Sequence, residues 1–137
     1  MKNFAITFIS ATLFISNASS VIANEDTVKT LMKSYQSQGA KPGNALQGEI
    51  FWKKTFQGKA PFSQRSCKSC HTVNLKIHGE HVRTGKVLKP LAPSINKLSL
   101  SKAKKVNKWF KRNCKWTTGK ECSAQEKADI LAFINQQ

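Results

Sequence analysis

The run Cys67-Lys68-Ser69-Cys70-His71 decides how the rest of this chain is organised. Its C-x-x-C-H spacing is the pattern that covalent haem attachment requires. Two thiols three positions apart on a turn of helix reach the two vinyl groups of one protohaem. The histidine that follows the second cysteine then falls beneath the ring and can bind iron from the proximal side. We therefore predict one haem c, attached through Cys67 and Cys70, with His71 as an iron ligand.

The rival interpretations of this cysteine pair are a zinc half-site, a thioredoxin-like dithiol and an accidental pair of structural cysteines, and the first two fit the sequence poorly. A zinc site would need a second C-x-x-C or an H-x-x-x-H pair. The other two cysteines, Cys114 and Cys122, instead lie eight positions apart and far downstream. A dithiol oxidoreductase would need a βαβ pattern around the motif, and none is visible.

The N-terminal stretch has the three parts of a secretory signal. Lys2 precedes an apolar run from Phe4 to Ile15, and small and polar residues follow as far as Ala23. The apolar run is too short for the roughly 20 residues that a spanning helix needs. We predict a signal peptide over residues 1–23 and a single periplasmic, non-membrane-spanning domain over residues 24–137. Export also suits the motif, because haem is attached outside the cytoplasm and cysteines can oxidise there.

Charge is the second global feature of the chain. It has 23 Lys and Arg against 7 Asp and Glu, a net charge of +16, and removal of residues 1–23 would leave +15. The segment 81–120 contains twelve basic residues and no acidic one. Such a field favours docking to an acidic redox partner, for example another cytochrome. An exported haem protein meets little nucleic acid, so we do not expect that partner. The alternative is a surface charge that serves solubility alone.

The remaining pattern predicts an all-α fold with about four helices around one haem. Asp26 can cap a first helix, Asn44 a second, and Ser99 or Ser101 begins a third. Ser123 and Glu126 form an S-x-x-E capping box that opens a fourth. Gly48, in the middle of the second helix, suggests a close crossing by another helix. The segment 72–99 is rich in turn residues and is predicted to be loop.

Apolar residues at helical spacing predict the buried face of each helix. The first face is Val28, Leu31, Met32 and Tyr35; the second Leu46, Ile50 and Phe51, with Trp52 beside them; the third Val106, Trp109, Phe110 and Asn113; the fourth Ile130, Leu131, Phe133 and Ile134.

The second axial position of the iron decides the function. An electron carrier usually fills it with Met or His, whereas a sensor or catalyst leaves it open or weakly held. The methionines of the chain are Met1 and Met32, and neither follows the haem motif. The candidates are therefore His78, His81, Asn113 or a lysine. Asn113 ends an otherwise apolar helical stripe, although Asn at a helix terminus is also a common C-cap.

The C-terminal half resembles the sphaeroides haem protein family, class I cytochromes c that are grouped with a domain of unknown function. The similar stretches are Arg83-Thr84-Gly85-Lys86 with Pro90-Leu91-Ala92-Pro93-Ser94, the run from Val106 to Cys114, and Cys122 with Glu126-Lys127-Ala128-Asp129. The resemblance implies a class I cytochrome c fold, Asn113 as the distal ligand of ferric iron, and a Cys114–Cys122 disulfide. The loop at 76–82 departs from the family pattern and keeps His78 and His81 as rivals.

The same resemblance implies that Asn113 leaves the iron on reduction and opens a site for oxygen, nitric oxide or another small ligand. A hard amide oxygen suits ferric iron better than ferrous iron, which agrees with such a switch. The alternative is a plain electron-transfer cytochrome that is six-coordinate in both redox states. An enzyme, such as a peroxidase or a reductase of a nitrogen oxide, ranks below both, because the distal helix offers Asn113 and Arg112 but no acid–base histidine.

Overall fold

The computed structural model describes residues 19–137, with side-chain burial from Asn24 onward. The elements in chain order are α1 (Ser19–Ser37), α2 (Ala45–Lys53), β1 (Phe56–Gln57), β2 (Gln64–Arg65), α3 (Lys68–His71), β3 (Gly79–Glu80), β4 (Val87–Leu88), α4 (Ala103–Thr118) and α5 (Ala124–Asn135). The all-α prediction is confirmed. The described residues form five helices, because the haem motif itself folds into the short helix α3.

Two short antiparallel ribbons lie between the helices, and one of them falls within the predicted loop at 72–99. Strand β1 pairs with β2, Phe56 lying opposite Arg65, and β3 pairs with β4, Gly79 lying opposite Leu88. Each strand has two residues, too few for a hydrophobic alternation to mark it in the sequence.

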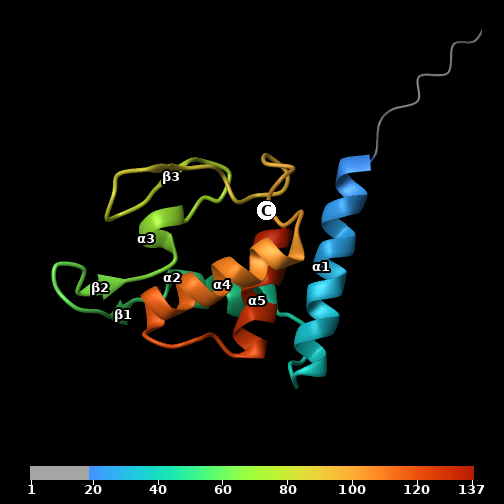
Figure 1. Cartoon of the computed structure of the whole chain (residues 1–137), viewed down its shortest axis with the longest axis horizontal. Coiled ribbons are helices and arrows are strands. Elements are labelled where there is room, and N and C mark those ends of the chain that lie inside the picture. The colour runs from blue at the N-terminus through green and yellow to red at the C-terminus, as the bar shows by residue number, and fades with distance from the viewer. Residues whose placement is uncertain (1–18) are drawn as a thin grey trace, which may run out of the picture.

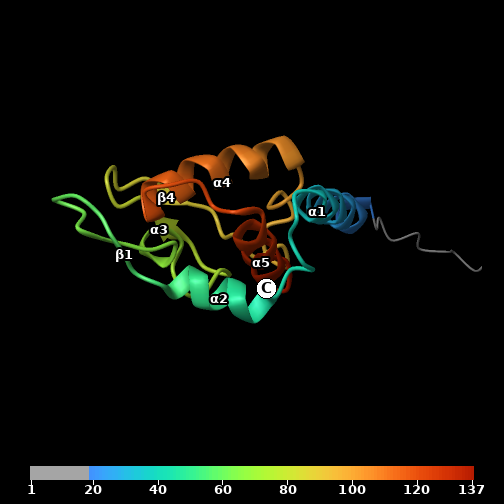
Figure 2. The ribbon, with the colours of Figure 1, turned by 90° about the horizontal axis from the view of Figure 1, so that it is seen from below.

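Helix α5 lies at the centre of the core and packs against both α2 and α1. Its predicted face is confirmed, since Ile130, Leu131, Phe133 and Ile134 are all buried. The predicted capping box is also present, with Ser123 and Glu126 bonded to each other's backbone N–H. Figure 2 shows α2 and α4 on opposite sides of the molecule, with α3 and α5 between them in that view.

The crossing of α2 and α5 explains Gly48. A Cβ at this position would overlap the backbone carbonyl of Asp129 and the Cβ of Phe133. The prediction of a close helix crossing is therefore confirmed. The predicted cap is confirmed as well, because the side chain of Asn44 accepts a hydrogen bond from Gln47 N.

The predicted apolar face of α2 is wrong in part. Leu46 and Ile50 are 63% and 52% exposed, whereas Gly48 and Trp52 are buried. The helix turns its glycine edge to α5, because the missing side chain at Gly48 lets the two backbones approach closely.

Two predicted helix starts are wrong. Helix α1 begins at Ser19, so Asp26 lies inside it and does not cap it. Helix α4 begins at Ala103 with Lys102 at its cap. The hydroxyls of Ser99 and Ser101 donate instead to the carbonyls of Leu91 and Leu98, which closes the preceding turns.

The predicted signal peptide falls largely outside the described residues, which start at residue 19. Helix α1 stands to one side of the molecule and contacts α4 and α5 (Figure 1). Within residues 19–137, no helix has both the length and the apolar character needed to cross a bilayer.

Candidate haem site

Helix α3 presents both motif cysteines within one turn. Cys67 is the N-cap of α3 and has helical backbone angles, and its carbonyl accepts hydrogen bonds from Cys70 N at 3.3 Å and His71 N at 3.1 Å. Both thiols are free and half-buried. Because residues three apart share a helix face, the two sulfurs lie on the same side of α3. Burial raises the pKa of the Cys67 thiol to about 12.

The imidazole of His71 packs against an aromatic wall. Its ring centroid lies 5.7 Å from that of Trp52, and Trp52 in turn lies 5.9 Å from Phe133 of α5. Burial lowers the pKa of His71 to about 4, with a smaller contribution from the nearby His81. The imidazole is therefore neutral at pH 7, which is the form that can bind a metal.

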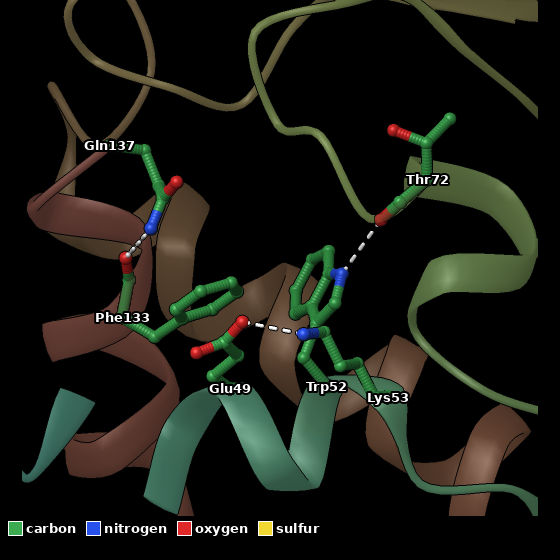
Figure 3. Close-up of polar contacts among 6 residues, drawn as sticks. All are labelled: Glu49, Trp52, Lys53, Thr72, Phe133 and Gln137. Carbon is green, nitrogen blue, oxygen red and sulfur yellow. Dashed lines mark hydrogen bonds and ion pairs between the residues drawn. The ribbon is translucent and has the colours of Figure 1, made fainter. Parts of the chain in front are cut away.

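The residue after His71 has an unusual backbone. Thr72 has φ of 65°, a conformation that is uncommon for a β-branched side chain. Two hydrogen bonds hold it there: Trp52 Nε1 donates to Thr72 O at 2.8 Å, and Thr72 Oγ1 donates to Asn74 O at 2.7 Å. Figure 3 shows the indole of Trp52 pointing from α2 toward this carbonyl. The turn sends the chain sharply away from α3 directly after the predicted proximal ligand.

Strand β3 then packs closely over the motif. A Cβ at Gly79 would overlap the carbonyl of Cys70 and approach the Cα of His71. Gly79 therefore lets the following loop lie against the backbone of α3.

The loop between α3 and α4 combines a buried anchor with exposed apolar side chains. The carbonyl of Leu75, a fully buried residue, accepts hydrogen bonds from Leu91 N and Ala92 N, both at 3.0 Å. Exposed large apolar side chains in the loop are Val73, Ile77, Val87, Ile95 and Leu98. A group with a large apolar surface would be covered well by such a loop.

Asn113 lies within α4, five residues before its last residue, Thr118. Gly119, in the left-handed conformation, is the C-cap. The interpretation of Asn113 as a C-cap is therefore wrong. Its side chain is exposed and makes no hydrogen bond with another residue of the described part of the chain.

The predicted buried face of α4 is rotated by part of a turn. Cys114 and Thr117 are buried, and Val106 and Phe110 are partly buried. Trp109, one turn before Asn113, is 44% exposed. Trp109 and Asn113 thus lie at the flank of the core-facing side, because the helix needs its Cys114 edge inward to reach Cys122.

Cys114 and Cys122 are joined by a disulfide with a Cα–Cα distance of 5.5 Å. The bridge ties the residue directly after Asn113 to the start of α5. It also occupies both cysteines that a zinc site would have to share with the motif.

The rival histidines lie in the β3–β4 region. His78 is exposed. His81 is half-buried, its Nδ1 lies 3.1 Å from Thr84 Oγ1, and its carbonyl accepts from Thr84 N and Gly85 N. To bind the iron through Nδ1, His81 would have to give up its contact with Thr84.

Several residues that shape the site were not predicted from the sequence. Thr72 and Gly79 act through backbone geometry, which no pattern of residue types in the surrounding loop indicates. Trp52 was placed in the second helix, but its hydrogen bond crosses 20 positions of sequence. Local patterns carry no information about such a contact.

These residues fit a covalently held haem. Two half-buried free thiols on one face of α3, a neutral imidazole directly after them and an apolar loop supply the attachment chemistry, the metal donor and the apolar cover. A helical fold with this motif defines the class: the molecule is a monohaem cytochrome of the c type.

Comparisons with known proteins agree. Residues 38–134 match the family described as a domain of unknown function (DUF1924). The chain is 32% identical over 120 residues to the cytochrome c-type protein SHP of Cereibacter sphaeroides, covering 88% of this chain and 92% of that protein. It is 36% identical over 88 residues to cytochrome c'' of Methylophilus methylotrophus, covering 64% of this chain and 60% of that protein.

Solved structures give the same result. Oxidised SHP, described as an oxygen-binding cytochrome c, superposes with a TM-score of 0.73 at 34% identity over 80% of this chain and 96% of that one. Oxidised cytochrome c'' gives 0.72 at 28% identity, over 85% and 96% of the two chains. The chain therefore belongs to the DUF1924 family of haem c proteins, with SHP among its relatives.

Proposed function

We propose that this protein is a periplasmic cytochrome that accepts an electron from an acidic partner, itself a cytochrome, and binds a small diatomic ligand in the reduced state. Oxygen and nitric oxide are the ligands we expect. The exported domain comprises residues 24–137, after removal of the signal peptide at residues 1–23.

Four side chains would carry this function. Cys67 and Cys70 would hold the haem through thioethers, His71 would bind the iron from one side, and Asn113 would bind it from the other in the ferric state. The haem supplies an iron that changes charge by one electron and accepts axial ligands. An amide oxygen is a hard, weak ligand, so reduction to the softer ferrous state favours release of Asn113.

The placement of Asn113 is the observation that carries the proposal. Its carboxamide is exposed on the flank of a helix and makes no hydrogen bond with the described residues. Trp109, one turn earlier, is also exposed, although a tryptophan side chain is usually buried to a large extent. An apolar group that covered this flank would shield Trp109 and provide a partner for the amide.

Two relatives support a labile distal ligand. The solved SHP structure is described as that of an oxygen-binding cytochrome c, and the solution structure of cytochrome c'' is described in terms of haem-ligand detachment. At 34% and 29% identity, these proteins support the same behaviour in this chain.

The alternative is an electron carrier with His78, His81 or a lysine as its sixth ligand. Its support is the position of His81, which lies half-buried in the loop that follows the haem motif. We place an enzyme third, because α4 offers no acid–base histidine beside Asn113.

The basic face of α4 is the proposed docking surface for the acidic partner. Lys104, Lys108, Lys111 and Lys115 are spaced to lie along one line of the helix, and all four are exposed. Lys111 and Lys115 lie 4.0 and 3.3 Å from Glu121, while Lys104 and Lys108 have no ion pair within the described chain. The latter pair carries uncompensated charge that would steer an acidic partner.

Visible spectroscopy tests the proposal. The ferric protein should be low-spin, the dithionite-reduced protein high-spin, and the reduced form should bind carbon monoxide at once. Asn113→Ala should be high-spin in both states, with His81→Ala as a matched control that changes neither. A reduced spectrum that stays low-spin and ignores carbon monoxide would contradict the switch and favour the closed carrier.

A further inference from the structure

Arg65 makes a set of contacts that joins two distant parts of the chain. Its side chain is half-buried. Nη1 donates to the carbonyl of Trp116 at 2.8 Å, and Nε donates to the carbonyl of Phe62 at 2.9 Å. The guanidinium also lies over the indole of Trp116, at 4.9 Å from the ring centroid. A planar guanidinium can stack and donate at once, which a lysine ammonium cannot do.

The accepting carbonyl lies in the last turn of α4. The final carbonyls of a helix have no intrahelical partner, and they form the negative end of its dipole. Gly119 N satisfies the carbonyl of Lys115. Arg65 supplies a charged donor to the next carbonyl, that of Trp116, and so caps α4 from another segment of the chain.

Arg65 is covalently close to the haem motif. It ends β2, and one residue, the buried Ser66, separates it from Cys67. Ser66 is fixed by Ser69, whose hydroxyl lies 2.8 Å from Ser66 Oγ and 3.1 Å from Ser66 N. A displacement of the Arg65 backbone would therefore displace α3 as well.

The same bond acts on the segment that carries Asn113. Trp116 lies three positions after Asn113, about one helical turn. The Cys114–Cys122 disulfide holds that turn to the start of α5, and Arg65 holds it to the haem motif. Asn113 thus lies on a turn of helix with tethers to two other parts of the molecule.

The β1–β2 connection is shaped around the guanidinium. A Cβ at Gly58 would overlap Arg65 Nε and the carbonyl of Phe62. An open cavity of about 250 Å³ adjoins the contact and is lined by Ala60, Pro61, Phe62, Arg65, Arg83 and Trp116. Arg83 lines this cavity without a hydrogen bond to the described chain, so it provides a matched control for charge.

We propose that Arg65 is a positioning residue that holds the Asn113 turn of α4 in register with the haem motif and thereby sets how readily Asn113 leaves the iron. The inference rests on the proposed function. A weak axial ligand is sensitive to small displacements, because the helix that carries it has to keep the amide oxygen at bonding distance from an iron held by α3.

Imidazole binding to the ferric holoprotein tests this inference, since imidazole competes with Asn113 for the distal position. Loss of a charge-assisted hydrogen bond changes the equilibrium constant that it affects by roughly tenfold. Arg65→Ala should therefore raise the affinity for imidazole about tenfold, and Arg65→Lys should raise it less, because an ammonium can still donate to Trp116. Arg83→Ala should leave it unchanged. If Arg65→Ala does not fold, Arg65→Lys carries the test.

The same Arg65 variants in an Asn113→Ala background separate this inference from the proposed function. With Asn113 removed, Arg65→Ala should no longer change imidazole affinity, since the residue acts through Asn113. An equal increase in both backgrounds, or no increase in the wild-type background, would overturn the role of Arg65 and leave the proposed function intact. An Asn113→Ala protein with unaltered imidazole affinity would overturn the proposed function and this inference with it.

Discussion

Trp52 of α2 donates its indole hydrogen bond to the carbonyl of Thr72, the residue directly after His71 (Figure 3). The 2.8 Å bond joins the backbone directly after the predicted proximal ligand to α2, a helix that is itself packed on α5. His71 is thereby supported by the hydrophobic core as well as by its own short helix. A helix of four residues has little stability of its own, so this support is needed.

Trp52→Phe should lower the free energy of unfolding by about 1–2 kcal/mol, through the lost hydrogen bond and the smaller buried ring. Denaturant unfolding of the ferric holoprotein measures it. Leu46→Ala is the control, because Leu46 lies on the same helix and its apolar side chain is 63% exposed. Equal stability losses in the two variants would show that the Thr72 bond contributes nothing.

Gly48→Ala should destabilise the protein by about 1–3 kcal/mol, because the added methyl would force α2 away from the Asp129 carbonyl. The sign is diagnostic. On an exposed helix the same substitution stabilises by up to about 1 kcal/mol. Thermal unfolding, with Gln47→Ala on the exposed side of α2 as control, gives the measurement; a stabilised Gly48→Ala protein would argue against the close crossing.

Replacement of Cys114 and Cys122 together by Ser should lower stability by about 2–3 kcal/mol, since the bridge closes a short loop in the unfolded chain. The variant should also bind imidazole more readily in the ferric state, because the Asn113 turn loses a tether. A change in stability alone, with imidazole affinity unaltered, would restrict the disulfide to a structural role.

Electron transfer from an acidic cytochrome should slow as ionic strength rises, because salt screens the attraction. Lys104→Gln with Lys108→Gln should reduce both the rate at low salt and the steepness of its salt dependence. Lys29→Gln with Lys33→Gln, exposed lysines on α1, provides the same charge change elsewhere. Stopped-flow kinetics compares the two pairs, and identical effects would show that net charge acts without a localised docking surface.

The buried hydroxyl of Tyr35 should make the free energy of unfolding fall in alkali. Its buried hydroxyl donates to Asn107 Oδ1 at 2.7 Å, and burial raises its pKa from 10.0 to about 12. Between these values the unfolded chain has lost the phenolic proton and the folded chain keeps it, so stability falls as pH rises. Tyr35→Phe should show a shallower fall than wild type from pH 10 to 12 in denaturant unfolding. Parallel curves for the two proteins would contradict this assignment.

The cofactor, the helical class and the family can all be predicted from the amino-acid sequence alone. A C-x-x-C-H run states its chemistry in five adjacent positions, and helix caps such as Asn44 and Ser123 bond within four residues, so local sequence contains the whole interaction. Gly48 was informative in another way. A glycine inside a helix lowers the stability of that helix, and a close crossing by a second helix explains why it is present.

Which helix edges face inward, and how the two sides of the site are joined, depend on contacts between elements that are distant in the sequence. Leu46 and Ile50 are exposed because α2 approaches α5 by its glycine edge, and Asp26 lies within a helix that had already begun. The bond from Arg65 to Trp116 crosses 51 positions of sequence, and that from Trp52 to Thr72 crosses 20. Such contacts depend on how whole helices and loops pack together. The pattern of apolar residues within one segment does not indicate which distant residue it will contact.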